Sequence, residues 1–62
     1  MMPFVQIDFL EGRTIEQKRA LVKKVTEAIV ETTNCPAEAV NIILREMPKE
    51  HLANAGKLRY DS

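Results

Sequence analysis

The fold of this chain is decided by residues 3–33, PFVQIDFLEGRTIEQKRALVKKVTEAIVETT. Side chains alternate in polarity over residues 3–10, a spacing that predicts a half-buried β-strand. One face of this strand carries Val5, Ile7 and Phe9, and the other carries Phe4, Gln6, Asp8 and Leu10. The residues that follow change to a helical spacing, so a strand and a helix are expected in succession.

A turn and a helix start follow the predicted strand. Gly12 gives the backbone freedom for the turn, and Thr14 stands three residues before Gln17, which is the spacing of a capping box. The helix is predicted over Ile15–Thr33. Its apolar stripe is expected to comprise Leu21, Val22, Val25, Ala28, Ile29 and Thr32. The side chains expected to face mostly water are Lys18, Lys23, Lys24, Glu27 and Glu31.

The helix is expected to end at Asn34, which tolerates the left-handed conformation, just before Pro36. A second strand is predicted over residues 39–46, whose central run is apolar on both faces. Such a strand suits a sheet covered by a helix on one side and by a neighbouring subunit on the other. Strand, helix and strand together predict a right-handed βαβ unit with parallel strands. The polar tail, residues 47–62, contains Gly56 and is expected to form a short hairpin.

The expected architecture is therefore α+β, with one domain spanning residues 1–62 and a single βαβ unit followed by a C-terminal hairpin. A chain of 62 residues folds to a surface of about 4,000 Å² from about 10,000 Å². Burial on that scale does no more than offset the conformational entropy lost on folding. We therefore expect an obligate oligomer in which partner chains pair with the open edges of the sheet.

Composition excludes several classes of function. Nine basic and nine acidic residues cancel, which argues against a nucleic-acid or anionic-membrane surface. One cysteine and one histidine can form neither an intrachain disulfide nor a four-ligand zinc site. No apolar run approaches a membrane span, and the N-terminus lacks the pattern of a signal peptide. We expect a cytoplasmic protein without such a zinc site.

Few residues can carry acid–base chemistry. His51 is read as a solvated surface residue and Cys35 as a partly buried spacer, because neither has the neighbours of a nucleophile. Arg13 follows the first strand at its carboxyl end, where its guanidinium suits either a substrate carboxylate or solvent. Pro3 is either a structural proline at a strand start or, if it becomes the N-terminus, a secondary amine. Beside apolar neighbours such an amine can act as a general base near neutral pH.

The segment PFVQIDFLEGRTIEQKRALVKKVTEAI resembles the opening of the 4-oxalocrotonate tautomerase family. The resemblance rests on an early proline, a Leu-Glu-Gly-Arg turn, a Glu-Gln-Lys helix start, Glu46-Met47 and the Ala-Gly of the tail. It implies βαβ subunits that pair as four-stranded dimers, and three such dimers forming a homohexamer. It also implies a cofactor-independent isomerase that interconverts enol and keto forms of 2-hydroxy-dienoates such as 2-hydroxymuconate, a step in the catabolism of aromatic compounds.

Residue roles are implied by the same resemblance. Pro3 is the position of the catalytic base, and Arg13 is that of the arginine that binds a substrate carboxylate. Two positions depart from the founding members: Asn41 stands where they have a second arginine, and Leu52 where they have an aromatic residue. Asn41 can donate a hydrogen bond to the 2-oxygen without supplying a charge. Leu10 and Leu52, with Phe4, are expected to exclude water from the Pro3 amine.

Several alternatives remain open at the level of the sequence. Arg45 lies on the same strand face as Asn41 and either replaces the missing arginine or is a surface residue. Met1 and Met2 precede Pro3, so the proline nitrogen is basic only if both are removed. The competing functions are a non-catalytic oligomeric module and a relative with dehalogenase or decarboxylase activity, for which Asp8 is the available acidic residue.

Overall fold

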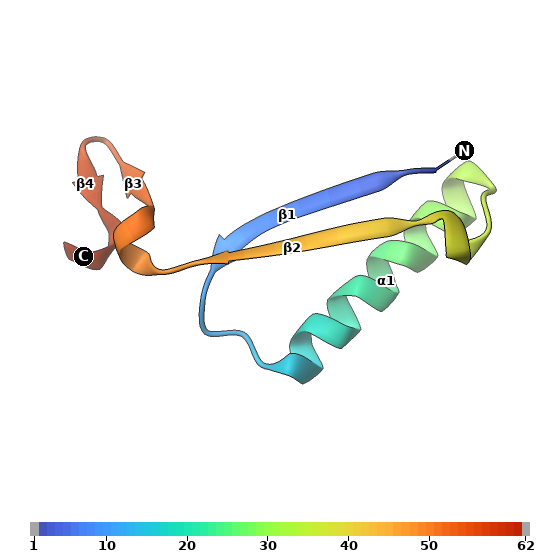
Figure 1. The fold of residues 1–62 in the computed structure, drawn as a ribbon, viewed down its shortest axis with the longest axis horizontal. Coiled ribbons are helices and arrows are strands. Elements are labelled where there is room, and N and C mark those ends of the chain that lie inside the picture. Colours follow the sequence, from blue (N-terminus) through green and yellow to red (C-terminus); the bar gives the residue numbers. More distant parts are fainter. Residues whose placement is uncertain (1, 62) are drawn as a thin grey trace.

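The computed structural model describes residues 2–61, which form a βαβ unit followed by a small hairpin (Figure 1). This architecture confirms the α+β prediction. The strands are β1 (Phe4–Leu10), β2 (Asn41–Met47), β3 (Ala53–Asn54) and β4 (Lys57–Leu58), and the helix is α1 (Ile15–Thr33). Three short 3₁₀ helices connect them: η1 (Ala37–Ala39), η2 (Lys49–His51) and η3 (Arg59–Asp61).

Strands β1 and β2 pair in parallel, as predicted, with Phe4 opposite Asn41 at the start of the register. Two backbone hydrogen bonds lengthen the ladder beyond the strands. The Asn41 N–H donates to the Pro3 carbonyl (3.0 Å), and the Glu11 N–H donates to the Met47 carbonyl (2.9 Å). The ladder therefore spans from Pro3 to the turn that precedes α1. β1 itself begins at Phe4, one residue later than predicted, because proline has no N–H to give to a ladder.

The bounds of α1 agree with the prediction because its two ends are specified locally. The Gln17 N–H donates to Thr14 Oγ1 (3.1 Å), and Gln17 Oε1 accepts from the Thr14 N–H (2.9 Å), so the capping box is complete. At the other end Asn34 is left-handed (φ 59°), and its N–H donates to the Val30 carbonyl (3.0 Å).

The second strand begins two residues later than predicted. Residues 37–39 form η1, in which the Ala39 N–H donates to the Pro36 carbonyl (3.0 Å) and the Val40 N–H to the Ala37 carbonyl (3.1 Å). This turn uses the amides of Ala39 and Val40, so the ladder starts at Asn41. The strand also runs on to Met47, which pairs with the last residue of β1.

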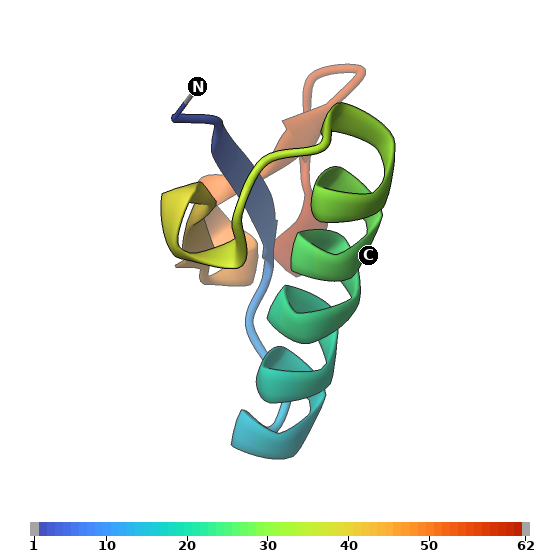
Figure 2. The ribbon, with the colours of Figure 1, turned by 90° about the vertical axis from the view of Figure 1, so that its right-hand side faces the viewer.

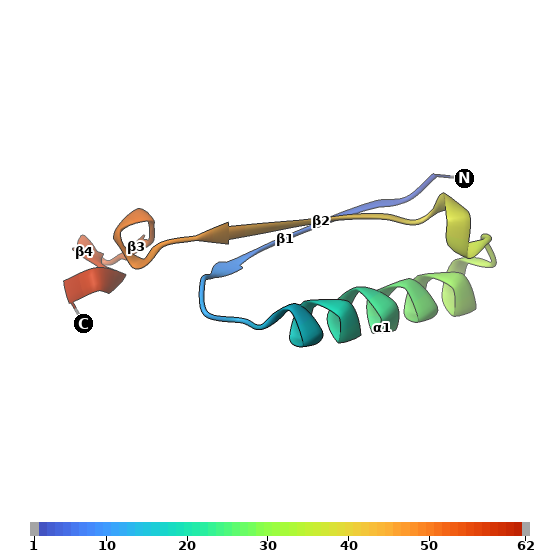
Figure 3. The ribbon, with the colours of Figure 1, turned by 60° about the horizontal axis from the view of Figure 1, so that its bottom comes forward.

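Helix α1 covers one face of the two-stranded sheet and leaves the other open (Figures 2 and 3). Alternation along the strands directs Val5, Ile7, Phe9, Ile42 and Leu44 toward the helix, and all five are half-buried. On the opposite face Phe4 is 66% exposed and Ile43 46% exposed. An open face with two large apolar side chains is typical of a surface that a partner covers.

One chain has almost no core of its own. Among residues 2–61, Cys35 alone is buried, at 6% exposure. The accessible surface is 5049 Å², against about 4,000 Å² for a compact protein of this mass. The Cα radius of gyration is 14.8 Å, against about 10.6 Å for a compact domain of this length. Within the described range, no helix is both long and apolar enough to cross a membrane.

The predicted helix stripe is only partly correct. Val22, Val25 and Ile29 are half-buried as expected, whereas Leu21, Ala28 and Thr32 remain exposed along one flank of α1. The prediction that Lys18 faces water is wrong. Its side chain is 23% exposed because it reaches the end of β2 and forms an ion pair with Glu46.

The capping box yields a stability prediction. Replacing Thr14 by Ala removes the acceptor of the Gln17 N–H and should lower the free energy of unfolding by about 1 kcal/mol. Urea titration at a fixed chain concentration, followed by circular dichroism, measures this loss. Thr32→Ala is the matched control, since the Thr32 hydroxyl bonds only to the Ala28 carbonyl within the helix. An equal loss in both variants would contradict the assignment.

Candidate active site

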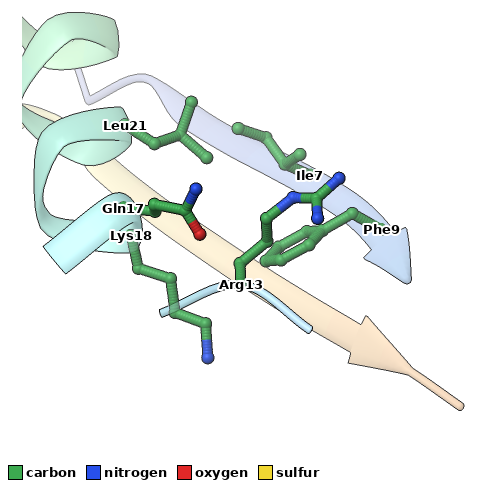
Figure 4. Close-up of a pocket in the computed structure, with 6 residues that line it drawn as sticks. All are labelled: Ile7, Phe9, Arg13, Gln17, Lys18 and Leu21. Carbon is green, nitrogen blue, oxygen red and sulfur yellow. The ribbon is translucent and has the colours of Figure 1, made fainter. Parts of the chain in front are cut away.

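A pocket of about 190 Å³ lies at the carboxyl end of β1, between the strand and the first turns of α1 (Figure 4). Strand and helix diverge here because the loop of residues 11–14 separates them. The pocket is lined by Ile7 and Phe9 from the strand, Arg13 from the loop, and Gln17, Lys18 and Leu21 from the helix. Its walls are mostly apolar, and its polar groups come from the loop and the helix.

Arg13 supplies the pocket with a cation that has no ion-pair partner in the described part of the chain. In the close-up its side chain extends past the Phe9 ring toward Ile7, while Leu21 faces it from the helix (Figure 4). Within residues 2–61 no carboxylate forms an ion pair with Arg13. A guanidinium beside apolar walls is suited to a ligand that carries a carboxylate on an apolar skeleton.

Lys18 contributes its aliphatic stem to the pocket and directs its ammonium elsewhere. The ammonium donates a hydrogen bond to Glu46 Oε1. Glu46 lies on the helix-facing side of β2, after the apolar residues Ile42 and Leu44. In the close-up the Lys18 ammonium points away from the Arg13 guanidinium (Figure 4). The charge of Lys18 is therefore neutralised at the rim of the pocket, and Arg13 remains the available cation there.

Pro3 and Asn41 lie together at the opposite end of the sheet. They are neighbours across the ladder, joined by the hydrogen bond to the Pro3 carbonyl. The Asn41 amide donates one N–H to the Ala39 carbonyl (3.0 Å), and its second N–H and its oxygen have no protein partner among residues 2–61. Seven residues of strand at about 3.3 Å each place this end roughly 23 Å from the Arg13 loop.

The two leucines of the predicted site lie elsewhere. Leu10 ends β1 on the face away from the helix. Leu52 precedes the β3–β4 hairpin, is 38% exposed, and lines a second pocket, of about 280 Å³, within that hairpin. The hairpin is closed by a hydrogen bond from the Arg59 N–H to the Leu52 carbonyl (2.8 Å) and projects beyond the sheet (Figures 1 and 3).

A single chain therefore does not bring the predicted site residues together. Pro3 and Asn41 form one group, Arg13 and Leu10 a second, and Leu52 stands apart. Sequence reasoning also missed the pocket walls. Ile7, Phe9 and Leu21 were read as core or stripe positions, and Gln17 as a cap only. The signal that could have found them is their nearness to Arg13, which follows from the strand–turn–helix order.

Of the remaining candidates, Arg45 and Cys35 have structural partners and His51 is exposed. Arg45 lies opposite Asp8 in the register, with Arg45 Nε 4.0 Å from Asp8 Oδ1, on the face away from the helix. Cys35 is buried and accepts a hydrogen bond from the Thr33 hydroxyl (3.2 Å). His51 is exposed at the end of η2.

Comparison with known proteins gives a consistent result. The model of a family described as "Tautomerase enzyme" matches residues 3–61. A protein of Bacillus subtilis named 2-hydroxymuconate tautomerase is 55% identical over 56 residues, which cover 90% of each chain. The crystal structure of YwhB, a homologue of 4-oxalocrotonate tautomerase, superposes with a TM-score of 0.92 at 52% identity, covering 97% of this chain and 98% of the other. A heterohexameric 4-oxalocrotonate tautomerase from Chloroflexus aurantiacus superposes with a TM-score of 0.90 at 30% identity, over 97% of both chains.

Proposed function

Because this chain belongs to the tautomerase family and is an isomerase, we propose that it tautomerises 2-hydroxy-dienoates related to 2-hydroxymuconate. The observation that carries the proposal is the unpartnered guanidinium of Arg13 in an apolar pocket. That pocket matches a substrate with a carboxylate on a flat, unsaturated carbon chain. Family membership favours this activity over the non-catalytic module.

Pro3 is the proposed general base, acting through its nitrogen once it is the first residue. The free amine takes the proton of the substrate's 2-hydroxyl, and the electron pair moves through the diene to a distal carbon. The protonated amine then returns the proton to that carbon, so the reaction is an isomerisation with no net proton change. Phe4, at 66% exposure in one chain, stands beside the amine and can exclude water once a partner covers it.

Arg13 and Asn41 have complementary proposed roles. Arg13 anchors the carboxylate with a planar pair of donors. The free N–H of Asn41 can donate to the 2-oxygen, where negative charge develops as the proton leaves. Leu10 and Leu52 are the proposed apolar boundaries. Arg45 is assigned a surface role, because it faces Asp8 across the ladder.

The separation of Pro3 from Arg13 requires that one site draw on more than one chain. The open β1 edge and the exposed Phe4 and Ile43 supply the surface for association. If a second β1 lay antiparallel along the first, the amine of one chain would lie near the Arg13 loop of the other. The Chloroflexus relative is a heterohexamer, and we propose a homohexamer of three such dimers in the cytoplasm.

The state of the N-terminus decides activity in this proposal. A chain that starts at Pro3 should convert 2-hydroxymuconate from enol to keto form, followed by its ultraviolet absorbance. A chain that keeps Met1 and Met2 has an amide at Pro3 and should be slower by a factor of about 100 or more, the usual contribution of a general base. Intact mass verifies each N-terminus. Equal rates from both forms would refute the role of Pro3.

If each site takes Pro3 from one chain and Arg13 from another, mixing two inactive variants should restore activity. Pro3→Ala and Arg13→Ala chains, unfolded together in equal amounts and refolded, should regain activity. Random assortment leaves both residues intact in about one quarter of sites drawn from two chains (half times half). Each variant refolded alone is the control. A mixture no more active than its components would show that one chain supplies both residues.

A further inference from the structure

The pocket in the C-terminal hairpin carries positive charge that the chemistry described so far does not use. It is lined by Leu52, Ala53, Asn54, Lys57 and Arg59. Two of these described residues are cations and none is a carboxylate. Within residues 2–61 neither Lys57 nor Arg59 forms an ion pair. A pocket of this kind is suited to an anionic group.

The pairing within the hairpin explains why the two cations lie with Leu52. Asn54 pairs with Lys57 in the β3–β4 register. The Arg59 N–H donates to the Leu52 carbonyl (2.8 Å), which continues this pairing by one step. Because side chains alternate between the two faces of a ladder, Leu52, Asn54, Lys57 and Arg59 share one face of the hairpin. That face is the wall of the pocket.

The two cations are close enough to act on one ligand. Lys57 and Arg59 are two residues apart, so their Cα atoms lie roughly 7 Å from each other. This separation is shorter than the distance over which salt screens charges, and an anion between the two side chains would relieve their repulsion. All of residues 51–61 are exposed in one chain, and the hairpin projects beyond the sheet (Figures 1 and 3). The pocket is therefore open to a ligand that other chains also hold.

The proposed substrate needs a second cation, because 2-hydroxymuconate carries two carboxylates. Arg13 anchors one of them, and Asn41 supplies no charge for the other. Arg45 already faces a carboxylate across the β1–β2 ladder. Leu52 is a proposed boundary of the site, and the backbone hydrogen bond ties Arg59 to it. A hairpin that brings Leu52 to the shared site therefore brings Arg59 with it.

We propose that Arg59 binds the substrate carboxylate remote from Arg13, so that the shared site prefers dicarboxylate enols. The guanidinium offers a planar pair of donors that matches a carboxylate, and Lys57 adds positive charge beside it. Leu52, on the same face, lies against the apolar carbon chain of the substrate. This inference rests on the proposed function, since it adds a specificity-determining residue to the same site.

Binding of two unreactive acids tests the inference apart from turnover. Sorbate and trans,trans-muconate share a six-carbon diene chain, lack the 2-hydroxyl, and carry one and two carboxylates, respectively. Calorimetry on the assembled protein should show tighter binding of muconate to the unaltered chain. Arg59→Gln removes the charge and keeps the backbone hydrogen bond to Leu52. It should weaken muconate binding about tenfold and change sorbate binding less than twofold.

Two further variants separate specificity from structure. Arg19→Gln removes an arginine from the exposed pair with Glu16, outside both pockets, and should leave both dissociation constants unchanged. Arg59→Met, which keeps a long side chain without charge, replaces Arg59→Gln if sedimentation shows that the latter fails to assemble.

The possible outcomes are distinct. Muconate binding in Arg59→Gln within twofold of the unaltered chain, or an equal loss for both acids, would overturn the inference. Either result leaves the proposed function standing if 2-hydroxymuconate turnover still depends on a free Pro3. Loss of that dependence together with the expected muconate-selective effect would instead reject the proposed function and retain Arg59 as a carboxylate-binding residue.

Discussion

The rest of this structure depends on one constraint: a single amphipathic helix can bury only one face of a two-stranded sheet, so the other face stays exposed in one chain. Helix α1 lies on the side of Val5, Ile7 and Phe9, and no other long element remains for the opposite face. Within residues 2–61 the result is a single buried residue, Cys35. Since apolar burial is the main favourable term in folding, the missing half of the core has to come from other chains.

The small size of the unit also explains why the residues of the proposed site lie at two ends of the sheet. A strand of seven residues separates Pro3 and Asn41 from the Arg13 loop, so the groups that would move a proton and hold a carboxylate stand at opposite ends. An antiparallel neighbour would bring such ends together without any change within either chain. Folding, association and assembly of the site would then be one event, and a chain unable to associate would lose its stability and its activity together.

Sequence signals that act within one helical turn were sufficient to predict much of the fold. The capping box at Thr14 and the left-handed Asn34 gave the bounds of α1, because both act within one turn. The start of β2 was missed because a 3₁₀ turn competed for two backbone amides. Lys18 was misplaced because its partner, Glu46, is distant in sequence, and no helical periodicity reports such a contact. The roles of site residues came from family resemblance, since a single chain does not bring those residues together.

The central claim, that the isolated chain is not a stable folded unit, is tested most directly by dilution. Sedimentation velocity and far-ultraviolet circular dichroism are recorded on the same samples over several decades of concentration. The account predicts that helical signal and assembled mass are lost together, with no folded single chain at any concentration. A helical species that sediments as one chain and keeps its signal on further dilution would contradict it.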